Sequence, residues 1–328
     1  DIIIKNIKTK INGVLLRDGN LYLTRGNEIT LKSEFSTDIN INKGNMNDYF
    51  SLLKQINLKN DLVKLNANLD HILNIKLDKT LKVLDYKYSN RGVIENFSYN
   101  LNLQKNEFFN EDIKVIELND SNIDIKYNSD KKYTVNTLGK YKLNNGNFQS
   151  FELSNTSSNG ANNLNISFET DQALNIDLIN FKKHKNDIAK ITSEIIIKNN
   201  VFDFKNIKLR EKKNLIIIEN FKIDKKKLVS LKRLKVKTFV KNIANNDFEI
   251  NFGKKINIKG KKYDAENLNK ILSNRSDSKF LTNINKDIEI NIENILTPLS
   301  REIFKFRLIG RIEKGKFVKI SSKGDFGN

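Results

Sequence analysis

The segment Asp287-Ile288-Glu289-Ile290-Asn291-Ile292-Glu293 alternates between polar and apolar side chains at every step. Successive side chains of a β-strand point to opposite faces, so this segment predicts a strand with one apolar and one polar face. Strands of this kind are typical of antiparallel sheets that water wets on one side. What this protein does then depends on what lies against the apolar face.

The same alternation recurs along most of the chain, before and after this segment. It predicts a long meander of about 18–20 strands, each taking about ten to fifteen residues with its turn. The apolar members of the clearest segments are the candidate residues lining an apolar groove: Leu73, Ile75, Leu77, Leu101, Leu103, Ile123, Ile125, Leu164, Ile166, Phe168, Phe202, Phe204, Ile216, Ile218, Phe221, Ile223, Ile288, Ile290, Ile292, Phe304, Phe306 and Leu308.

Short polar segments with glycine or asparagine predict the turns between these strands. They are Arg17-Asp18-Gly19-Asn20, Asn144-Asn145-Gly146-Asn147, Lys198-Asn199-Asn200 and Glu313-Lys314-Gly315-Lys316. Residues 154–163, rich in Ser, Asn and Gly, predict a loop.

Helical spacing of apolar residues is rare. It appears over residues 47–56, with Asn47 as N-cap, and over residues 264–273, with Asp264 as N-cap. A third short helix is predicted over residues 185–191. Helices of two to three turns are stable only when they dock on the sheet.

Composition excludes several classes of protein. The chain has 328 residues and no cysteine, so disulfide scaffolds, thiolate metal sites and cysteine nucleophiles are excluded. The longest aliphatic run, Leu215 to Ile218, is far shorter than the ~20 residues of a membrane-spanning helix.

The net charge of +19 fits both lysine-rich solvated strands and attraction to anionic surfaces. Because the chain begins Asp1-Ile2 and its last residues show no distinct tail, we expect an excerpt of a longer protein.

The sequence offers little material for catalysis. His71 and His184 are the only histidines, and we expect both at the surface or at a strand edge. Carboxylate pairs such as Glu111-Asp112 have no partner histidine or nucleophile motif beside them. We therefore expect no enzyme, no metal and no cofactor.

A sheet with one apolar face is completed by a second sheet, by closure into a barrel, or by a ligand in a groove. The chain has one proline and no Pro-, Gly- or Ser-rich linker, which favours one continuous elongated unit over separate sandwich domains. Periodicity alone leaves both a filled sandwich and an open groove possible. A groove lined by aliphatic residues and phenylalanine suits acyl chains.

The C-terminal part carries a more specific pattern. A strand ending at Gly260 is followed by the helix start Asp264-Ala265, by the alternating segment 287–293, and by a hairpin with Gly310 and Gly315. This order resembles the AsmA-like superfamily, and in particular its YhdP-type members in the bridge-like lipid transfer group. The resemblance covers residues 195–328; residues 1–194 resemble the family only in their alternation.

This resemblance implies an all-β fold with a few short helices, in which a long twisted antiparallel sheet curls into an open apolar groove. We expect a groove segment over residues 1–194 and an AsmA/YhdP-like segment over residues 195–328. The family implies a periplasmic protein of Gram-negative bacteria, anchored in the inner membrane by a segment outside this sequence. The implied function is transport of phospholipid between inner and outer membrane, with acyl chains as the ligand and no nucleic acid.

Two other functions remain open. One is an envelope structural or outer-membrane-assembly factor of TamB type, whose partners are outer-membrane proteins. The other is a repetitive β-rich surface adhesin, which a closed solenoid with a polar binding face would favour.

Overall fold

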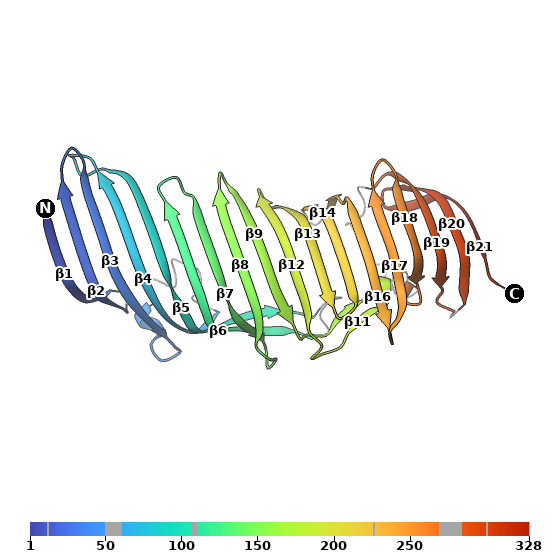
Figure 1. The fold of residues 1–328 in the computed structure, drawn as a ribbon, viewed down its shortest axis with the longest axis horizontal. Coiled ribbons are helices and arrows are strands. Elements are labelled where there is room, and N and C mark those ends of the chain that lie inside the picture. Colours follow the sequence, from blue (N-terminus) through green and yellow to red (C-terminus); the bar gives the residue numbers. More distant parts are fainter. Residues whose placement is uncertain are drawn as a thin grey trace. The chain divides into compact units, whose positions relative to one another are not determined.

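The computed structural model describes residues 1–11, 13–49, 61–105, 111–225, 227–268, 284–299 and 301–327. Strands account for 75% of the structure and helices for 3%, which makes the fold all-β as predicted. The strands, shown in Figure 1, are β1 Ile2–Ile11, β2 Val14–Arg25, β3 Ile29–Ile41, β4 Leu62–Leu77, β5 Val83–Leu103, β6 Ile113–Asn128, β7 Tyr133–Leu143, β8 Gln149–Ser158, β9 Ala161–Thr170, β10 Leu174–Ile176, β11 Phe181–Lys183, β12 Ala189–Lys198, β13 Val201–Glu211, β14 Asn214–Asp224, β15 Lys227–Ser230, β16 Arg233–Val240, β17 Ile243–Phe252, β18 Ile256–Asp264, β19 Lys286–Leu296, β20 Glu302–Glu313 and β21 Lys316–Asp325.

Nineteen of these strands form one sheet that does not close into a barrel, and β10 and β11 form a separate two-stranded sheet. Most strands pair with their neighbour in sequence and run antiparallel to it. β18 and β19 run parallel to each other, so the sheet is mixed, whereas a wholly antiparallel sheet was predicted. Parallel strands need a long connection, and residues 265–285 separate β18 from β19 in the sequence.

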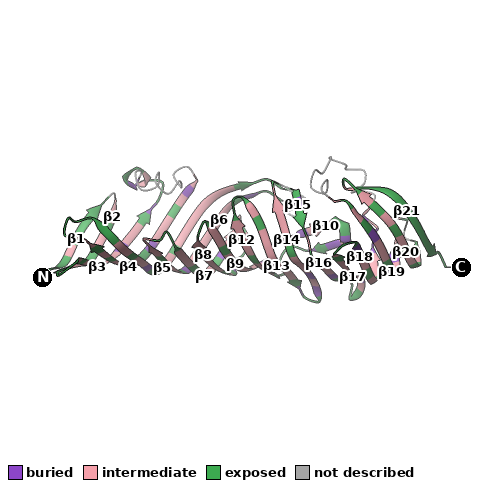
Figure 2. Ribbon diagram, turned by 90° about the horizontal axis from the view of Figure 1, so that it is seen from above, coloured by how far each residue is buried: buried purple, intermediate pink, exposed green. Residues whose placement is uncertain are grey.

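The chain divides into two compact units. Unit 1 comprises residues 1–104 and 112–163, and unit 2 comprises residues 105–111 and 164–328. The division expected at residues 194 and 195 falls inside β12. Along strands such as β4 in unit 1 and β20 in unit 2, exposed residues alternate with buried or half-buried ones (Figure 2), because successive side chains take opposite faces. β1 and β21 are instead exposed almost throughout.

Three of the four predicted turns join strands. Asn199 and Asn200, between β12 and β13, both have positive φ (50° and 61°), as a type I′ hairpin requires. The prediction at Arg17–Asn20 was wrong, because these residues lie inside β2. There a register shift and a φ of 53° at Asp18 form a β-bulge that bends the strand without ending it.

The loop predicted over residues 154–163 was also wrong. Residues up to Ser158 continue β8, and β9 begins at Ala161, so only Asn159 and Gly160 form a turn. Ser and Asn here occupy strand positions, because cross-strand pairing with β7 outweighs their local preference for turns.

The helix predictions met different outcomes. Residues 46–49 form a short 3₁₀ helix, η1 (Met46–Tyr49), and the rest of the predicted 47–56 helix lies outside the described residues. Asp264 is the last residue of β18, and its Oδ1 accepts a hydrogen bond from the Glu266 N–H at 3.2 Å; residues 269–273 lie outside the described part. The helix at residues 185–191 was wrong, because Ala189 and Ile191 belong to β12 with a period of two.

Glycines mark places where two backbones approach each other on the sheet. A Cβ at Gly92 of β5 would lie 2.0 Å from the Asn68 carbonyl oxygen of β4. A Cβ at Gly139 of β7 would lie 2.2 Å from Ser121 Oγ of β6, beside the bulge at Asn119–Asn122. Only glycine, which has no Cβ, fits where two backbones lie so close together. These glycines therefore allow the paired strands to bend tightly at these points.

Candidate functional site

The candidate site in unit 2 is a row of aliphatic side chains that crosses seven strands. Pairing in register connects its members one after another, from β13 to β20, and places them on one face of the sheet. We call the following seven residues the aliphatic row: Ile207, Ile218, Leu234, Ile250, Ile258, Ile290 and Leu308. All seven are half-buried, so part of each side chain still meets solvent.

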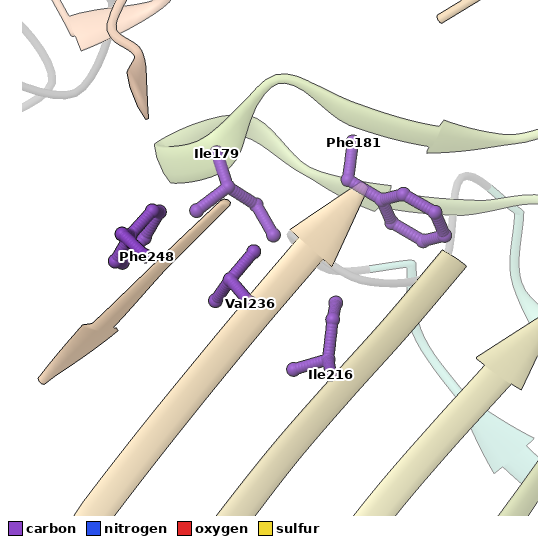
Figure 3. Close-up of a cluster of buried hydrophobic side chains, with 5 residues drawn as sticks. All are labelled: Ile179, Phe181, Ile216, Val236 and Phe248. Carbon is purple, nitrogen blue, oxygen red and sulfur yellow. The ribbon is translucent and has the colours of Figure 1, made fainter. Parts of the chain in front are cut away.

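A neighbouring row of the same face is covered by the chain itself. Ile216, Val236 and Phe248, which we call the seat, are 7%, 1% and 7% exposed. They pack against Ile179 and Phe181 of the hairpin Leu174–Lys183, which consists of β10, the 3₁₀ helix η2 (Asp177–Ile179) and β11 (Figure 3). The hairpin therefore covers the seat, whereas the described residues cover the aliphatic row only in part, since Leu234, Ile250 and Ile258 also contact this cluster.

Polar groups hold the tip of this hairpin on the sheet. Asn246, which is fully buried, donates from Nδ2 to the Ile179 carbonyl at 2.6 Å. The Tyr263 hydroxyl donates to the Leu178 carbonyl at 2.9 Å, and burial raises the pKa of Tyr263 to about 12. The hydroxyl therefore keeps its proton, and remains a donor, over the whole physiological pH range.

One face of unit 1 differs in composition from the face of unit 2 described above. We define it by Leu65, Ala67, Leu69, His71, Leu73, Ile75 and Leu77 of β4 and the residues of β5 to β8 in register with them. None of these inward positions is Lys, Arg, Asp or Glu, although 30% of the chain is charged. Five of the chain's nine tyrosines occupy these positions, namely Tyr86, Tyr88, Tyr127, Tyr133 and Tyr141, and a sixth, Tyr99, stacks on Phe97 of the same face.

The prediction for His71 was wrong: it is 9% exposed and lies on the apolar face between Leu69 and Leu73. Its Nε2 lies 2.7 Å from Thr37 Oγ1, and its Nδ1 lies 2.7 Å from the Tyr88 hydroxyl and 2.9 Å from Asn90 Nδ2. Phe35 stacks on the imidazole at 4.6 Å. Hydrogen bonds at both nitrogens explain how this polar ring is accommodated among apolar neighbours.

Burial lowers the pKa of His71, and the nearby Asp70 opposes this only in part. Since the folded state binds the proton less well than the unfolded chain, the neutral ring supports folding above pH about 6.5, the ordinary value for histidine. We expect the free energy of unfolding to fall as the pH drops below that value. Urea titrations of the wild type and His71→Gln at several pH values measure this. The variant should show a flatter dependence, and identical slopes would contradict the role of His71.

The candidate lining residues fall into three groups in the structure. Ile216, Ile288 and Ile292 are buried, the first under the hairpin and the third beside Ala265. Leu103, Phe202 and Phe304 are exposed. The remaining members are half-buried: Leu73, Ile75, Leu77, Leu101, Ile123, Ile125, Leu164, Ile166, Phe168, Phe204, Ile218, Phe221, Ile223, Ile290, Phe306 and Leu308.

Sequence reasoning missed the tyrosines and His71. The spacing of Tyr86 and Tyr88, and of His71 with Leu69 and Leu73, is two residues, so the alternation itself contained the signal. Tyrosine and histidine are amphipathic, so a pattern of aliphatic residues and phenylalanine alone does not include them.

The opposite face of unit 2 carries the charges. Arg233 lies between Glu249 at 2.5 Å and Glu219 at 3.5 Å, and its hydrogen bond lowers the pKa of Glu249. Lys255 pairs with Glu289 at 2.5 Å. These pairs are solvent-accessible and contribute little stability each, but they fix this face as the one that water wets.

Unit 1 also has a basic hollow of about 530 Å³, which residues of β4 to β8 line. Lys87, Lys126 and Lys132 contribute to it together with the hydroxyl-bearing residues Thr134 and Thr156. The surface here suits contact with anionic groups.

Among the described residues, no group of three or more His, Cys, Asp and Glu side chains could hold a metal ion. In the same part of the chain, no helix has the length and apolarity needed to cross a bilayer. Comparison with protein-family models, with curated proteins and with solved structures gave no match. Function is therefore inferred from the two faces of the sheet.

Proposed function

We propose that this protein is a lipid-binding module without catalytic activity, and that acyl chains lie along the aliphatic row of unit 2. The observation that carries this proposal is the composition of that row. Seven aliphatic side chains follow one another in register without a polar interruption, and each remains half-buried. A conventional core would bury such side chains almost completely, as it does for Val236 at 1%.

The dimensions support an extended hydrocarbon ligand. Neighbouring strands lie about 4.8 Å apart, so six steps give the aliphatic row a length of about 29 Å. One leaflet contributes about half of the ~30 Å hydrocarbon core of a bilayer, so an acyl chain fits within the row. Each methylene that leaves water contributes about 0.8 kcal/mol, which largely offsets extraction from a membrane.

Phospholipid transport across the cell envelope is the wider role that we propose. It rests on the resemblance to YhdP-type proteins, and so do a periplasmic location and an inner-membrane anchor outside this sequence. The net charge of +19 and the basic hollow favour an approach to anionic lipid headgroups.

A pair of photo-crosslinking probes tests the binding proposal. Ile290 and Glu289 are adjacent in β19, yet Ile290 belongs to the aliphatic row while Glu289 pairs with Lys255 on the charged face. With phospholipid vesicles, a probe at position 290 should crosslink lipid, and one at position 289 should not. Equal labelling at both positions, or labelling only at 289, would refute an acyl-chain site on the row.

A second function is favoured by the tyrosines of unit 1. Tyrosine offers a large apolar surface with a polar end, and it is enriched in protein–protein interfaces. Six tyrosines on one face therefore fit an assembly factor that binds envelope proteins. Lipid-free protein should then retain outer-membrane proteins in a pull-down, and substituting Tyr88 and Tyr127 with serine should abolish the capture.

A further inference from the structure

The hairpin Leu174–Lys183 lies on apolar surface that is continuous with the aliphatic row. Ile216, Val236 and Phe248 of the seat stand two residues from Ile218, Leu234 and Ile250 of the row, each pair on one strand and one face. Ile179 and Phe181, only 4% and 3% exposed, fill the seat with apolar side chains (Figure 3). Seat and row thus have the same chemistry, and they differ in how completely the hairpin covers them.

The hairpin is attached differently from the strands beneath it. β10 and β11 pair with each other through three residues each and form a sheet of their own. Contacts with the large sheet instead come from side chains, many of them at the turn. Asn180 donates from Nδ2 to Asp264 Oδ2 at 2.9 Å and accepts from Asn267 Nδ2 at 2.7 Å. Side-chain contacts of this kind can be exchanged for water without breaking the ladder of the large sheet.

We propose that the seat is a second acyl-chain site and that the hairpin is a displaceable lid over it. This inference rests on the proposed function. When the hairpin moves away, the apolar surface exposed on the seat is covered again by an acyl chain, which replaces Ile179 and Phe181. The apolar surface open to lipid then grows from one row to two neighbouring rows.

Asn180→Gly is the variant that loosens the lid. Asn180 has a φ of 45°, a left-handed conformation that glycine adopts without strain, so the turn itself is preserved. The substitution removes the hydrogen bonds of the Asn180 side chain to Asp264, Glu266 and Asn267. It leaves the seat and the aliphatic row unchanged.

A crosslink between the hairpin and the residues beneath it should have the opposite effect and hold the lid closed. The chain has no cysteine, so Asn180→Cys with Asn267→Cys introduces a unique pair, and mild oxidation can join these neighbouring side chains as a disulfide. Before crosslinking, this double variant also lacks the hydrogen bonds of the Asn180 side chain. The same protein can therefore be measured with a loosened hairpin, before crosslinking, and with a fixed hairpin, after it. Asn136→Cys with Ser154→Cys is the matched control, since these residues face each other across β7 and β8 of unit 1, with 2.7 Å between their polar atoms.

The readout is the number of molecules of cis-parinaric acid, a fluorescent fatty acid, that bind to each protein chain. Hydrogen–deuterium exchange of residues 174–183 follows the lid at the same time. We expect about twofold more ligand and faster exchange in Asn180→Gly than in the wild type. Crosslinking the 180/267 pair should reverse both changes, and crosslinking the 136/154 pair should alter neither.

The lid proposal is overturned if exchange in residues 174–183 stays at the wild-type level in both loosened variants, or if exchange rises while bound ligand does not. Failure of the proposed function gives a different result, because the wild type would then bind no parinaric acid at all. Circular dichroism of each variant verifies that the sheet has formed.

Discussion

Ile218→Asp is expected to weaken acyl-chain binding by about a hundredfold or more. Ile218 lies within the aliphatic row, paired with Ile207 on one side and Leu234 on the other. An acyl chain crossing this point would have to desolvate the new carboxylate, which costs several kcal/mol, or leave a hydrated gap in its contact. A loss of about 3 kcal/mol corresponds to this hundredfold change in affinity. Titration with cis-parinaric acid measures the effect.

The adjacent residue provides the control. Ile217 is also a half-buried isoleucine of β14, but it faces the opposite side and pairs with Lys208 and Lys235. Ile217→Asp adds the same charge beside two lysines, so we expect affinity to change less than about twofold. Equal losses in the two variants would mean that the effect is one of folding or net charge. An unchanged affinity in Ile218→Asp would remove the aliphatic row as the binding site.

Gly92→Ala is expected to lower the free energy of unfolding by about 3 kcal/mol, the upper part of the range for overpacking. The added methyl group would lie 2.0 Å from the Asn68 carbonyl oxygen and 2.9 Å from Leu69 Cα. Both atoms belong to the backbone of β4, so relief requires two paired strands to separate, since no side chain can rotate away. Urea unfolding monitored by circular dichroism measures the change.

Gly26→Ala is the matched control for this experiment. The nearest atom to an added Cβ there is the Glu28 carbonyl oxygen at 3.8 Å, which is ordinary contact. Its effect should stay within about 0.5 kcal/mol. If both variants lose the same stability, the cost comes from the general loss of glycine and not from close approach of β4 and β5.

The two pairs of variants examine different properties of one sheet. The isoleucine pair asks which face binds lipid, and the glycine pair asks how closely the backbones approach each other. A wild-type level of binding in Gly26→Ala would also show that the glycine controls do not disturb the aliphatic row.

Alternation along single segments determined the strands and their two faces. Ile288, Ile290 and Ile292 share a side because side-chain direction in a strand has a period of two, and this holds whatever the strand pairs with. The charged face was predicted in the same way, because Glu289 and its polar neighbours alternate with these isoleucines. The hairpin turns at Asn199-Asn200 and Lys314-Gly315 were equally local, because asparagine and glycine adopt positive φ at low cost and so favour a turn by themselves.

Tertiary structure alone decided what lies on the apolar face. Ile216 and Ile218 are equivalent in sequence pattern, yet the hairpin buries the first and leaves the second half-buried. The sequence also did not predict that β18 and β19 run parallel, nor that Asn180 contacts Asp264, which lies 84 residues away. The two-residue period of a strand determines to which face a side chain points. Which segment then buries that side chain depends on contacts between distant parts of the chain.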